Sequence, residues 1–466
     1  MTEVLLSSRP GETVMAAKTD GILTDFKWER EEEISLVGQI YRGIVKRSVA
    51  AMDAFFVDIG KEKNGFLRKK DAPEGQTLTE GSPVIVRVEK DGTGTKGPLV
   101  SGHISIPGRY AVLLAGSSYI GVSRKIEDEH KRLRLKQLGR SICPDGYGMI
   151  IRTAAGNTDE RTLTYDFENL ARLGEIIKKR FHRGKRPELL YRESDLAVRA
   201  FRDYIKLPGD RIITDDKKIW KILKNSISAD ANLPEDTLIF YEGKRPLFSA
   251  YGLDQQIEAL FQRQVTLPSG GTIVIDPTEA LTAIDVNSGT FQGQGMPHED
   301  LAYVTNREAA AEIARQIRLR SIGGMILIDF IDMKNDSRRN AVVRALREAV
   351  ASDYVKTVVL GMTRLGLVEM TRTRMGKSLT EAYFDTCPVC GGRGRILSAK
   401  AAAHRIMEAI REKEPLREPL IVSCHQEVKP ILDRWLEETG KQGMLRTEIC
   451  DTPYRETYSL LLDREG

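Results

Sequence analysis

Two apolar runs in the second half of the chain, residues 281–286 and 325–330, each carry an aspartate near the end, and a helical pattern lies between them. Short apolar runs of this length are typical of buried strands. A β-rich run over 272–276 precedes the first by only a few turn residues, too few for a helical crossover, so the two are expected to form a hairpin. This alternation of strands and helices predicts a layered α/β sheet.

The helical pattern between the two runs has recognisable ends. The capping box Thr305-x-x-Glu308 is its predicted start, and Gly323-Gly324 is predicted to close it just after residue 320. The remaining elements expected in this half are a helix over 338–351, a buried strand over 357–360, a strand over 420–423 and a helix over 427–439.

Three oxygen-bearing side chains follow these strands. Asp285 and Asn287 are two positions apart and therefore project from the same face of a strand. Asp329 converges on them if the two strands are neighbours. Carboxylate and amide oxygens without a nearby histidine or thiolate suit Mg²⁺ or Mn²⁺, held partly by water and by a substrate phosphate. Acids at strand ends are also common turn and capping residues, but the triple favours a metal site for phosphate chemistry.

Two other classes of enzyme have little support. The six histidines include no HExxH motif and no close pair, which favours metal-assisted hydrolysis over a histidine-pair ribonuclease mechanism. No G-x-x-x-x-G-K-[ST] motif occurs, which disfavours an NTPase.

The first half contains five short β-rich runs broken by turn residues, over 39–49, 54–59, 65–67, 83–88 and 99–106. This spacing predicts a small barrel. Basic and aromatic residues alternate there, a mixture that suits single-stranded nucleic acid because cations follow the phosphates and rings stack on bases. Phe55 and Phe56 cannot face the same side of a strand, so core packing and base stacking both remain open for them.

An apolar strand over 149–151 runs into Arg152 and Thr153, and a basic helix is expected over 168–183. An arginine beside a hydroxyl at a strand end can bind a phosphate through paired guanidinium donors and the O–H group. The basic helix is more typical of a solvated face.

The CPVC motif at 387–390 has the form of half a zinc site, because a closed structural site needs four ligands and Cys387 and Cys390 supply two. The same motif of a second subunit can supply the missing pair, which implies a zinc-linked homodimer. The alternatives are an intramolecular site that uses Cys424 or His425, and a redox motif.

The composition is that of a soluble, folded protein. The chain has 466 residues, 41% of them hydrophobic and 29% charged, and its net charge of +5 permits an anionic partner without requiring one. Five scattered cysteines and the lack of a signal sequence predict a reducing, cytoplasmic location. No apolar stretch approaches the roughly 18 residues of a transmembrane helix, so no membrane association is expected.

Six segments follow one another in the order found in a known family: FFVDIGKEKNGFL at 55–67, MIIRT at 149–153, RAFRDY at 199–204, ALTAIDVNSG at 280–289, GGMILIDFIDM at 323–333 and CPVCGGRG at 387–394. Together they resemble the catalytic region of the bacterial ribonuclease E/G family, in particular its short ribonuclease G type, over nearly the whole chain. The resemblance implies an endoribonuclease that cuts single-stranded A/U-rich RNA and leaves 5′-monophosphate products. It also implies stimulation by a substrate 5′-monophosphate and roles in rRNA maturation and mRNA turnover.

The architecture that this resemblance implies is an α/β multidomain (α+β) chain. Its parts are an RNase H-like domain made of 1–34 and 198–260, an inserted S1 (OB-type) barrel at 35–102, a 5′-sensor at 103–197, a DNase I-like catalytic subdomain at 261–383, a zinc link at 384–398 and a small oligomerisation domain at 399–466.

Carried onto matching positions, the resemblance implies that Asp285 and Asp329 are magnesium ligands, with Mn²⁺ as a substitute, and that Asn287 orients Asp285 or the attacked phosphate. Asp332 belongs to the same motif, but on strand parity it does not face with Asp329, so a supporting role is expected.

The resemblance assigns RNA contacts in the barrel to Phe56, Phe66 and Lys96. It thereby favours base stacking for Phe56 and leaves Phe55 for the core.

It also places Arg152 and Thr153 in a pocket for the 5′-monophosphate, and makes Cys387 and Cys390 zinc ligands shared between the subunits of a homo-oligomer, at least a dimer. The long disordered scaffold of some members does not follow residue 466, so partners bound through such a scaffold are not expected.

Two other functions stay open at this point. One is an RNA-binding protein without catalysis, built on the S1-like barrel. The other is a metal-dependent DNA nuclease, which the carboxylates alone would allow.

Overall fold

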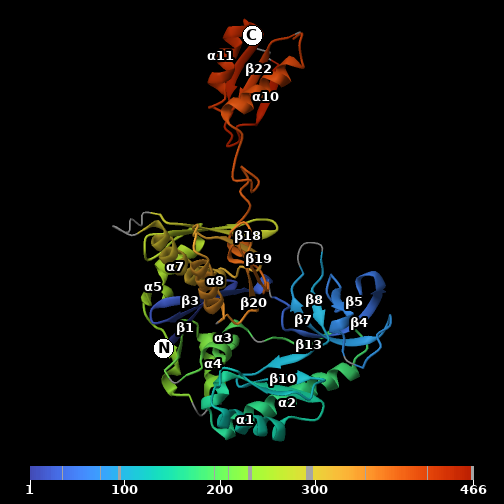
Figure 1. Cartoon of the computed structure of the whole chain (residues 1–466). Helices are drawn as coiled ribbons and strands as arrows, with labels where there is room; N and C mark the ends of the chain where they lie inside the picture. The colour runs from blue at the N-terminus through green and yellow to red at the C-terminus, as the bar shows by residue number, and fades with distance from the viewer. Residues whose placement is uncertain are drawn as a thin grey trace. The chain divides into compact units, whose positions relative to one another are not determined.

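The computed structural model describes residues 1–33, 35–73, 75–92, 96–193, 195–207, 209–228, 233–289, 297–351, 353–416 and 418–462 (Figure 1). They divide into two units, Met1–Ala382 and Tyr383–Gly466, which are described separately. None of the helices described is long and apolar enough to cross a membrane.

Two distant segments of the first unit build one five-stranded sheet, in the order β15-β14-β1-β2-β3. The strands are β1 (Thr2–Arg9), β2 (Glu12–Thr19), β3 (Ile22–Arg30), β14 (Arg211–Thr214) and β15 (Leu238–Phe240). β14 pairs in parallel with β1. Two helices, α3 (Leu196–Tyr204) and α4 (Lys217–Ser228), pack on this sheet through a core that includes Leu6, Met15 and Leu223.

The predicted five-stranded barrel is confirmed. Its strands are β4 (Ile40–Val49), β5 (Ala54–Asp58), β6 (Gly65–Arg68), β7 (Pro83–Lys90) and β8 (Leu99–Ser101). They follow one another in the order β4-β5-β6-β8-β7, and pairing of β7 with β4 closes the barrel. Phe55, Val57 and Leu67 lie in its core, while β13 (Glu188–Tyr191) adds to β4 from outside.

The prediction of one strand over 99–106 is wrong, because the chain turns after Ser101. The N–H of Gly102 donates to the carbonyl of Asp71 at 2.7 Å, and a Cβ at Gly102 would lie 2.4 Å from Pro73. Glycine permits this close approach, and the chain then leaves the barrel.

The next strand, β9 (Ser105–Pro107), belongs to a second sheet, of order β11-β12-β10-β9. Its other strands are β10 (Ala111–Ala115), β11 (Ile120–Val122) and β12 (Tyr147–Ile151), and its helices are α1 (Glu129–Ile142) and α2 (Glu160–Arg183). Helix α2 begins eight residues before the predicted position 168, because Asp159 caps it by accepting from the N–H of Thr162 at 3.0 Å. Leu163 and Phe167 extend its buried face.

A six-stranded sheet of order β16-β17-β18-β19-β21-β20 follows in the chain. Its strands are β16 (Gln264–Thr266), β17 (Thr272–Pro277), β18 (Leu281–Asn287), β19 (Gly324–Asp329), β20 (Thr357–Met362) and β21 (Val368–Arg372). The predicted hairpin of β17 and β18 is confirmed, and β18 runs parallel to β19. Short helices α5 (Leu247–Ala250) and α6 (Asp254–Glu258) precede this sheet, and α9 (Leu379–Tyr383) follows it.

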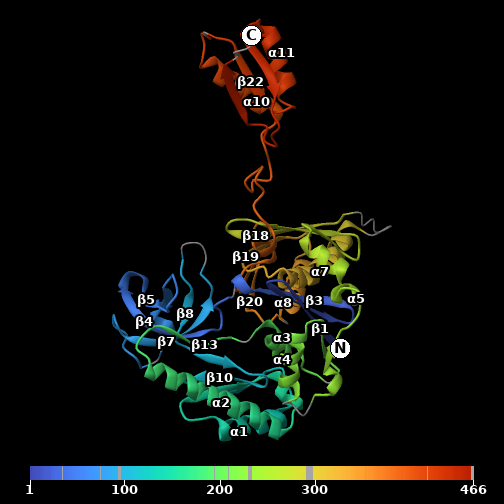
Figure 2. The same ribbon diagram turned by 180° about the vertical axis from the view of Figure 1, so that it is seen from behind.

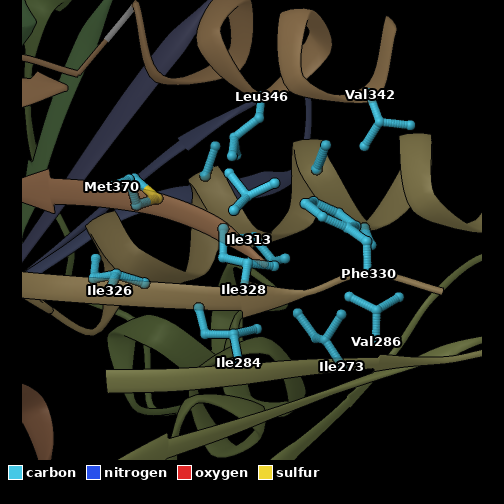
Figure 3. Packing of buried hydrophobic residues seen from close by; sticks show 14 of the residues in the cluster. Ile273, Ile284, Val286, Ile313, Ile326, Ile328, Phe330, Val342, Leu346 and Met370 are labelled. Atoms are coloured by element: carbon cyan, nitrogen blue, oxygen red, sulfur yellow. The ribbon is translucent and has the colours of Figure 1, made fainter. Parts of the chain in front are cut away.

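Helices α7 (His298–Leu319) and α8 (Asp336–Val350) cover one face of the six-stranded sheet (Figure 3). Helix α7 also lies beside β3 of the first sheet in both views (Figures 1 and 2). Arg315 and Arg318 of α7 donate to the carbonyls of Leu23 and Thr24 at 3.0 and 2.9 Å. These contacts fix α7 between the two sheets.

The predicted capping box at the start of α7 is wrong. The helix begins at His298 after Pro297, so Thr305 lies inside it, fully buried, and Glu308 accepts instead from the N–H of Ser269 at 3.0 Å. The helix also ends at Leu319, before the glycines predicted to close it.

The prediction that the strand near 357–360 is buried is also wrong. β21, which sequence patterning missed, inserts between β19 and β20 and leaves β20 at the edge. Val358 and Leu360 are therefore 40% and 60% exposed.

The second unit is a small α/β layer. Its sheet has the order β23-β22-β24, from β22 (Leu420–Cys424), β23 (Leu445–Ile449) and β24 (Tyr458–Leu462), and it packs on α10 (Ala399–Arg411) and α11 (Lys429–Thr439). The strand and helix predicted from 420 and 427 onward are confirmed within two residues.

Candidate functional site

The two candidate metal-binding carboxylates stand side by side. β18 and β19 are parallel neighbours, and Asp285 is the register partner of Asp329. Adjacent strands lie about 4.8 Å apart and paired residues point to the same face, so a single ion bound there would lie within reach of both carboxylates. The expected convergence is confirmed.

Alternation along the strands explains their position. Ile284, Val286, Ile326 and Ile328 are at most 4% exposed and face α7 and α8 (Figure 3). Residues of opposite parity project from the other face, which places both aspartates in solvent.

Asn287 supports Asp285. Its Nδ2 donates to Oδ2 of Asp285 at 2.8 Å, as their spacing on one strand face predicts. This hydrogen bond fixes the rotamer of Asp285 at the end of β18.

Negative charge accumulates at this edge. Partial burial, followed by the charges of Asp285 and Asp332, raises the pKa of Asp329. No lysine, arginine or histidine in the described ranges forms an ion pair with Asp285 or Asp329. A divalent cation would relieve this repulsion, and the donor set therefore fits Mg²⁺.

The described residues contain no group of three or more His, Cys, Asp or Glu side chains that could hold a metal ion. The two carboxylates would thus share a metal with water and a phosphate, the usual arrangement for Mg²⁺ at phosphate-processing sites.

The parity argument for Asp332 is wrong, because β19 ends at Asp329 and Asp332 lies in the following loop. Its charge contributes to the raised pKa of Asp329, so it belongs to the electrostatic surroundings of the site.

Asn306 holds this loop, and sequence patterning missed it. The fully buried side chain on α7 donates from Nδ2 to the carbonyl of Ile331 at 2.8 Å, and Oδ1 accepts from the N–H of Ile331 at 3.0 Å. Ile331 lies between Asp329 and Asp332, so Asn306 clamps the segment that joins them. In the sequence, the one signal for this role is that Asn306 is an amide on the apolar side of a helix.

Replacing Asn306 by leucine is expected to lower the turnover number about 10- to 100-fold, the range typical for residues that orient metal ligands. The unpaired backbone groups of Ile331 should also cost about 1–3 kcal/mol each in unfolding free energy. Gln316→Leu is the control, because Gln316 is equally buried on α7 but contacts Glu312 and Arg320. Equal losses of turnover in both variants would contradict a positioning role.

Arg152 and Thr153 lie at the end of β12. Arg152 donates from Nη1 to the carbonyl of Gly108 at 2.8 Å and from Nη2 to Asp203 at 2.7 Å. The hydroxyl of Thr153 is 2.9 Å from that of Ser123. The sequence did not indicate the residues that hold these two side chains, namely Gly108 and Asp203 for Arg152 and Ser123 for Thr153.

The barrel separates the two adjacent phenylalanines as expected. Phe55 is 6% exposed in the core, whereas the half-buried Phe56 lies on the other face, with its ring centroid 5.8 Å from that of Phe66. Lys96 is exposed in the loop before β8, two residues from Pro98, whose carbonyl accepts from the N–H of Phe66 at 2.8 Å. The three residues therefore belong to neighbouring parts of the barrel.

Cys387 and Cys390 lie in a tight turn of the second unit. The N–H of Gly394 donates to Sγ of Cys390 at 3.3 Å, and this bond lowers the pKa of the Cys390 thiol. A lowered pKa favours the thiolate that zinc requires. In the part of the chain that is described, neither Cys424 nor His425 joins them in a three-ligand group.

Two carboxylates on one face of an α/β sheet, in a chain that also carries an OB-like barrel, are compatible with an enzyme that acts on nucleic acids. The family model of the Ribonuclease E/G family matches residues 105–375, and the chain belongs to this family. It is 39% identical to Ribonuclease G of Escherichia coli K12 over 428 residues, 88% of this chain and 87% of the relative.

Two further relatives extend the comparison. Ribonuclease G of Haemophilus influenzae is 37% identical over the same shares of both chains. Ribonuclease E of Escherichia coli K12 is 37% identical over 90% of this chain but only 41% of its own length.

Proposed function

We propose that the chain is a Mg²⁺-dependent endoribonuclease that cuts single-stranded A/U-rich RNA and leaves 5′-monophosphate ends. Family membership supports the ribonuclease activity. The observation that carries the catalytic part is the register pair Asp285 and Asp329, two carboxylates on one sheet face without a cationic partner among the described residues.

In this proposal Asp285 and Asp329 hold the metal, and Asn287 keeps Asp285 in the binding rotamer through its 2.8 Å hydrogen bond. When bound, Mg²⁺ or Mn²⁺ would lower the pKa of a water molecule and stabilise charge on the phosphoryl oxygens. Asn306 keeps the loop after Asp329 in place during the reaction.

The barrel would select single strands. Phe56 and Phe66 would stack on unpaired bases, because the bases inside a duplex are already stacked on one another. Lys96 adds a positive charge that would attract the phosphate backbone. The proposed substrates are rRNA precursors and mRNA, in the roles that the family resemblance implies.

Phe56→Ala is expected to weaken single-stranded RNA binding about tenfold, because stacking of one base on an aromatic ring contributes about 1–3 kcal/mol. Fluorescence anisotropy of a labelled RNA in EDTA measures this change without cleavage. Phe56→Tyr, which keeps the ring, should bind like the wild type. Equal affinity of the alanine variant would contradict base stacking.

Arg152 and Thr153 would bind a 5′-monophosphate, so that RNA with this end is cleaved faster than RNA with a 5′-hydroxyl. Three N–H groups of Arg152 remain after its two hydrogen bonds, enough for a phosphate.

Cys387 and Cys390 are proposed to share a structural Zn²⁺ with the same pair of a second subunit. The absence of a third ligand among the described residues supports sharing, since a structural site needs four.

Serine at position 387 or 390 is therefore expected to abolish zinc binding and to convert the dimer into a monomer, as measured by metal analysis and light scattering. Cys143→Ser, in the other unit, should keep both zinc and the dimer. A zinc-free variant that remains dimeric would contradict the proposal that zinc links the two subunits.

The second candidate is an RNA-binding protein without catalysis, which the barrel surface alone favours. One experiment separates the candidates: a single sequence is offered as single- and double-stranded RNA and DNA with Mg²⁺. Internal cuts only in single-stranded RNA support the proposal. Cuts in DNA indicate a DNA nuclease, and intact but gel-shifted RNA indicates a binding protein.

A further inference from the structure

A cluster of ion pairs joins the end of β12 to the end of α3. Asp203 accepts from Nη2 of Arg152 at 2.7 Å, and also from Nε and Nη2 of Arg202 at 3.2 and 3.0 Å. Arg202 in turn donates to Glu193 at 2.8 Å. The side chains of Arg152 and Asp203 are 27% and 32% exposed, so one carboxylate holds two arginines at the edge of solvent.

Arg152 is fixed at two points by these contacts. Its Nη1 donates to the carbonyl of Gly108 and its Nη2 to Asp203, from two different segments of the chain. A guanidinium held at both Nη atoms has one orientation, which presets its three remaining N–H groups. Thr153 follows Arg152 directly in the chain, and its hydroxyl lies 2.9 Å from that of Ser123.

Positive charge is in excess here. Burial, followed by the charges of Lys125 and Arg152, lowers the pKa of Lys206, although Asp203 and Asp25 act in the opposite direction. Burial acts to raise the pKa of Asp203, but the hydrogen bonds and charges of Arg202 and Arg152 together lower it. The carboxylate is therefore already engaged by two arginines. A phosphate dianion would relieve the remaining repulsion among the cations.

We infer that Asp203 is a positioning residue for recognition of the RNA 5′ end: it orients Arg152 and does not itself contact the phosphate. This inference rests on the proposed stimulation by a 5′-monophosphate. The inference predicts a direction opposite to that of simple electrostatics, because removal of a negative charge near an anion site would by itself strengthen phosphate binding. If orientation dominates, loss of Asp203 weakens it.

The test compares kcat/KM for one A/U-rich RNA that bears either a 5′-monophosphate or a 5′-hydroxyl. In Asp203→Asn the ratio of the two values is expected to fall at least fivefold toward one, through a higher KM for the monophosphate RNA. Glu193→Gln is the matched control, because it removes the other carboxylate from Arg202 and leaves Arg152 untouched; its ratio should stay within twofold of the wild type. Asp203→Glu, which keeps the charge but displaces the guanidinium, tests the same point if the asparagine variant does not fold.

A double-variant comparison shows whether Asp203 acts through Arg152. The ratio for Arg152→Ala with Asp203→Asn should equal that for Arg152→Ala alone. An unchanged or increased ratio in Asp203→Asn, or an equal fall in Glu193→Gln, would overturn the inference while the proposed function stands. A wild-type ratio of one would instead overturn the proposed 5′-end stimulation, and the inference with it.

Discussion

Replacement of Asp329 by asparagine is expected to lower kcat/KM for RNA cleavage about a thousandfold. The variant keeps the shape of the side chain but removes one of the two charges proposed to hold the metal at the ends of β18 and β19. A metal contributes several kcal/mol of charge stabilisation in the transition state, and a loss of about 4 kcal/mol corresponds to three factors of ten. Single-turnover cleavage with saturating Mg²⁺ measures this loss.

Glu369→Gln provides the matched control. Glu369 lies on β21 as the register partner of Leu327, exposed on the same open sheet face two residues along β19 from Asp329. Its replacement should change kcat/KM less than twofold. RNA affinity in EDTA should be equal in wild type and Asp329→Asn. An Asp329→Asn variant that retains a tenth of the activity would contradict the metal role.

Replacement of Arg42 by methionine is expected to lower the free energy of unfolding by about 3–5 kcal/mol, because three backbone carbonyls lose their donor and each carbonyl left buried without a partner costs about 1–3 kcal/mol. Arg42 is fully buried on β4, yet it closes the end of α2. It donates to the carbonyls of Arg180, Phe181 and Arg186, the first two in the last turn of the helix. Its positive charge also complements the helix dipole.

Gly184 makes this arrangement sterically specific, because a Cβ there would lie 1.5 Å from Nη1 of Arg42. Urea unfolding followed by circular dichroism measures the predicted loss. Lys46→Met is the control on the same strand: Lys46 is 55% exposed and pairs with Asp58, so its loss should change stability by at most about 1 kcal/mol. An Arg42→Met variant as stable as this control would contradict the account of the α2 terminus.

Local patterning predicted the elements whose burial follows a simple period. The short apolar runs of β18 and β19 indicated both strands, and the two-residue spacing of Asp285 and Asn287 placed their side chains on one face. The barrel strands were found because turn residues separate them. Parity indicated that Phe55 and Phe56 face opposite sides of the strand, and the family resemblance was needed to assign Phe55 to the core.

The failures have physical causes. β21 was missed because one of its three buried positions, Val368, Met370 and Arg372, is an arginine. A charged residue breaks the apolar pattern that predicts a buried strand. Arg372 is tolerated there because Asp353 accepts from its Nε at 2.7 Å. The start of α7 was misplaced because a capping pattern occurs by chance inside a longer buried helix.

The supporting residues of the site could not be predicted, because they act through tertiary contacts. Asn306 meets Ile331 from 25 residues away, and Asp203 meets Arg152 from 51 residues away. No period or short motif encodes such a pairing. Sequence patterning thus indicated the candidate residues of the site, whereas the structure was needed to find the residues that hold them in place.

The Asp285 and Asp329 edge is proposed to make this chain a metal-dependent endoribonuclease. The decisive experiment is gel-resolved cleavage of one A/U-rich single-stranded RNA by the wild-type protein, with Mg²⁺ or with EDTA. The expected result is a set of discrete internal cuts with Mg²⁺, with 5′-monophosphate ends on the downstream products, and no cuts with EDTA. The same cuts in EDTA, or RNA that stays intact with Mg²⁺, would contradict it.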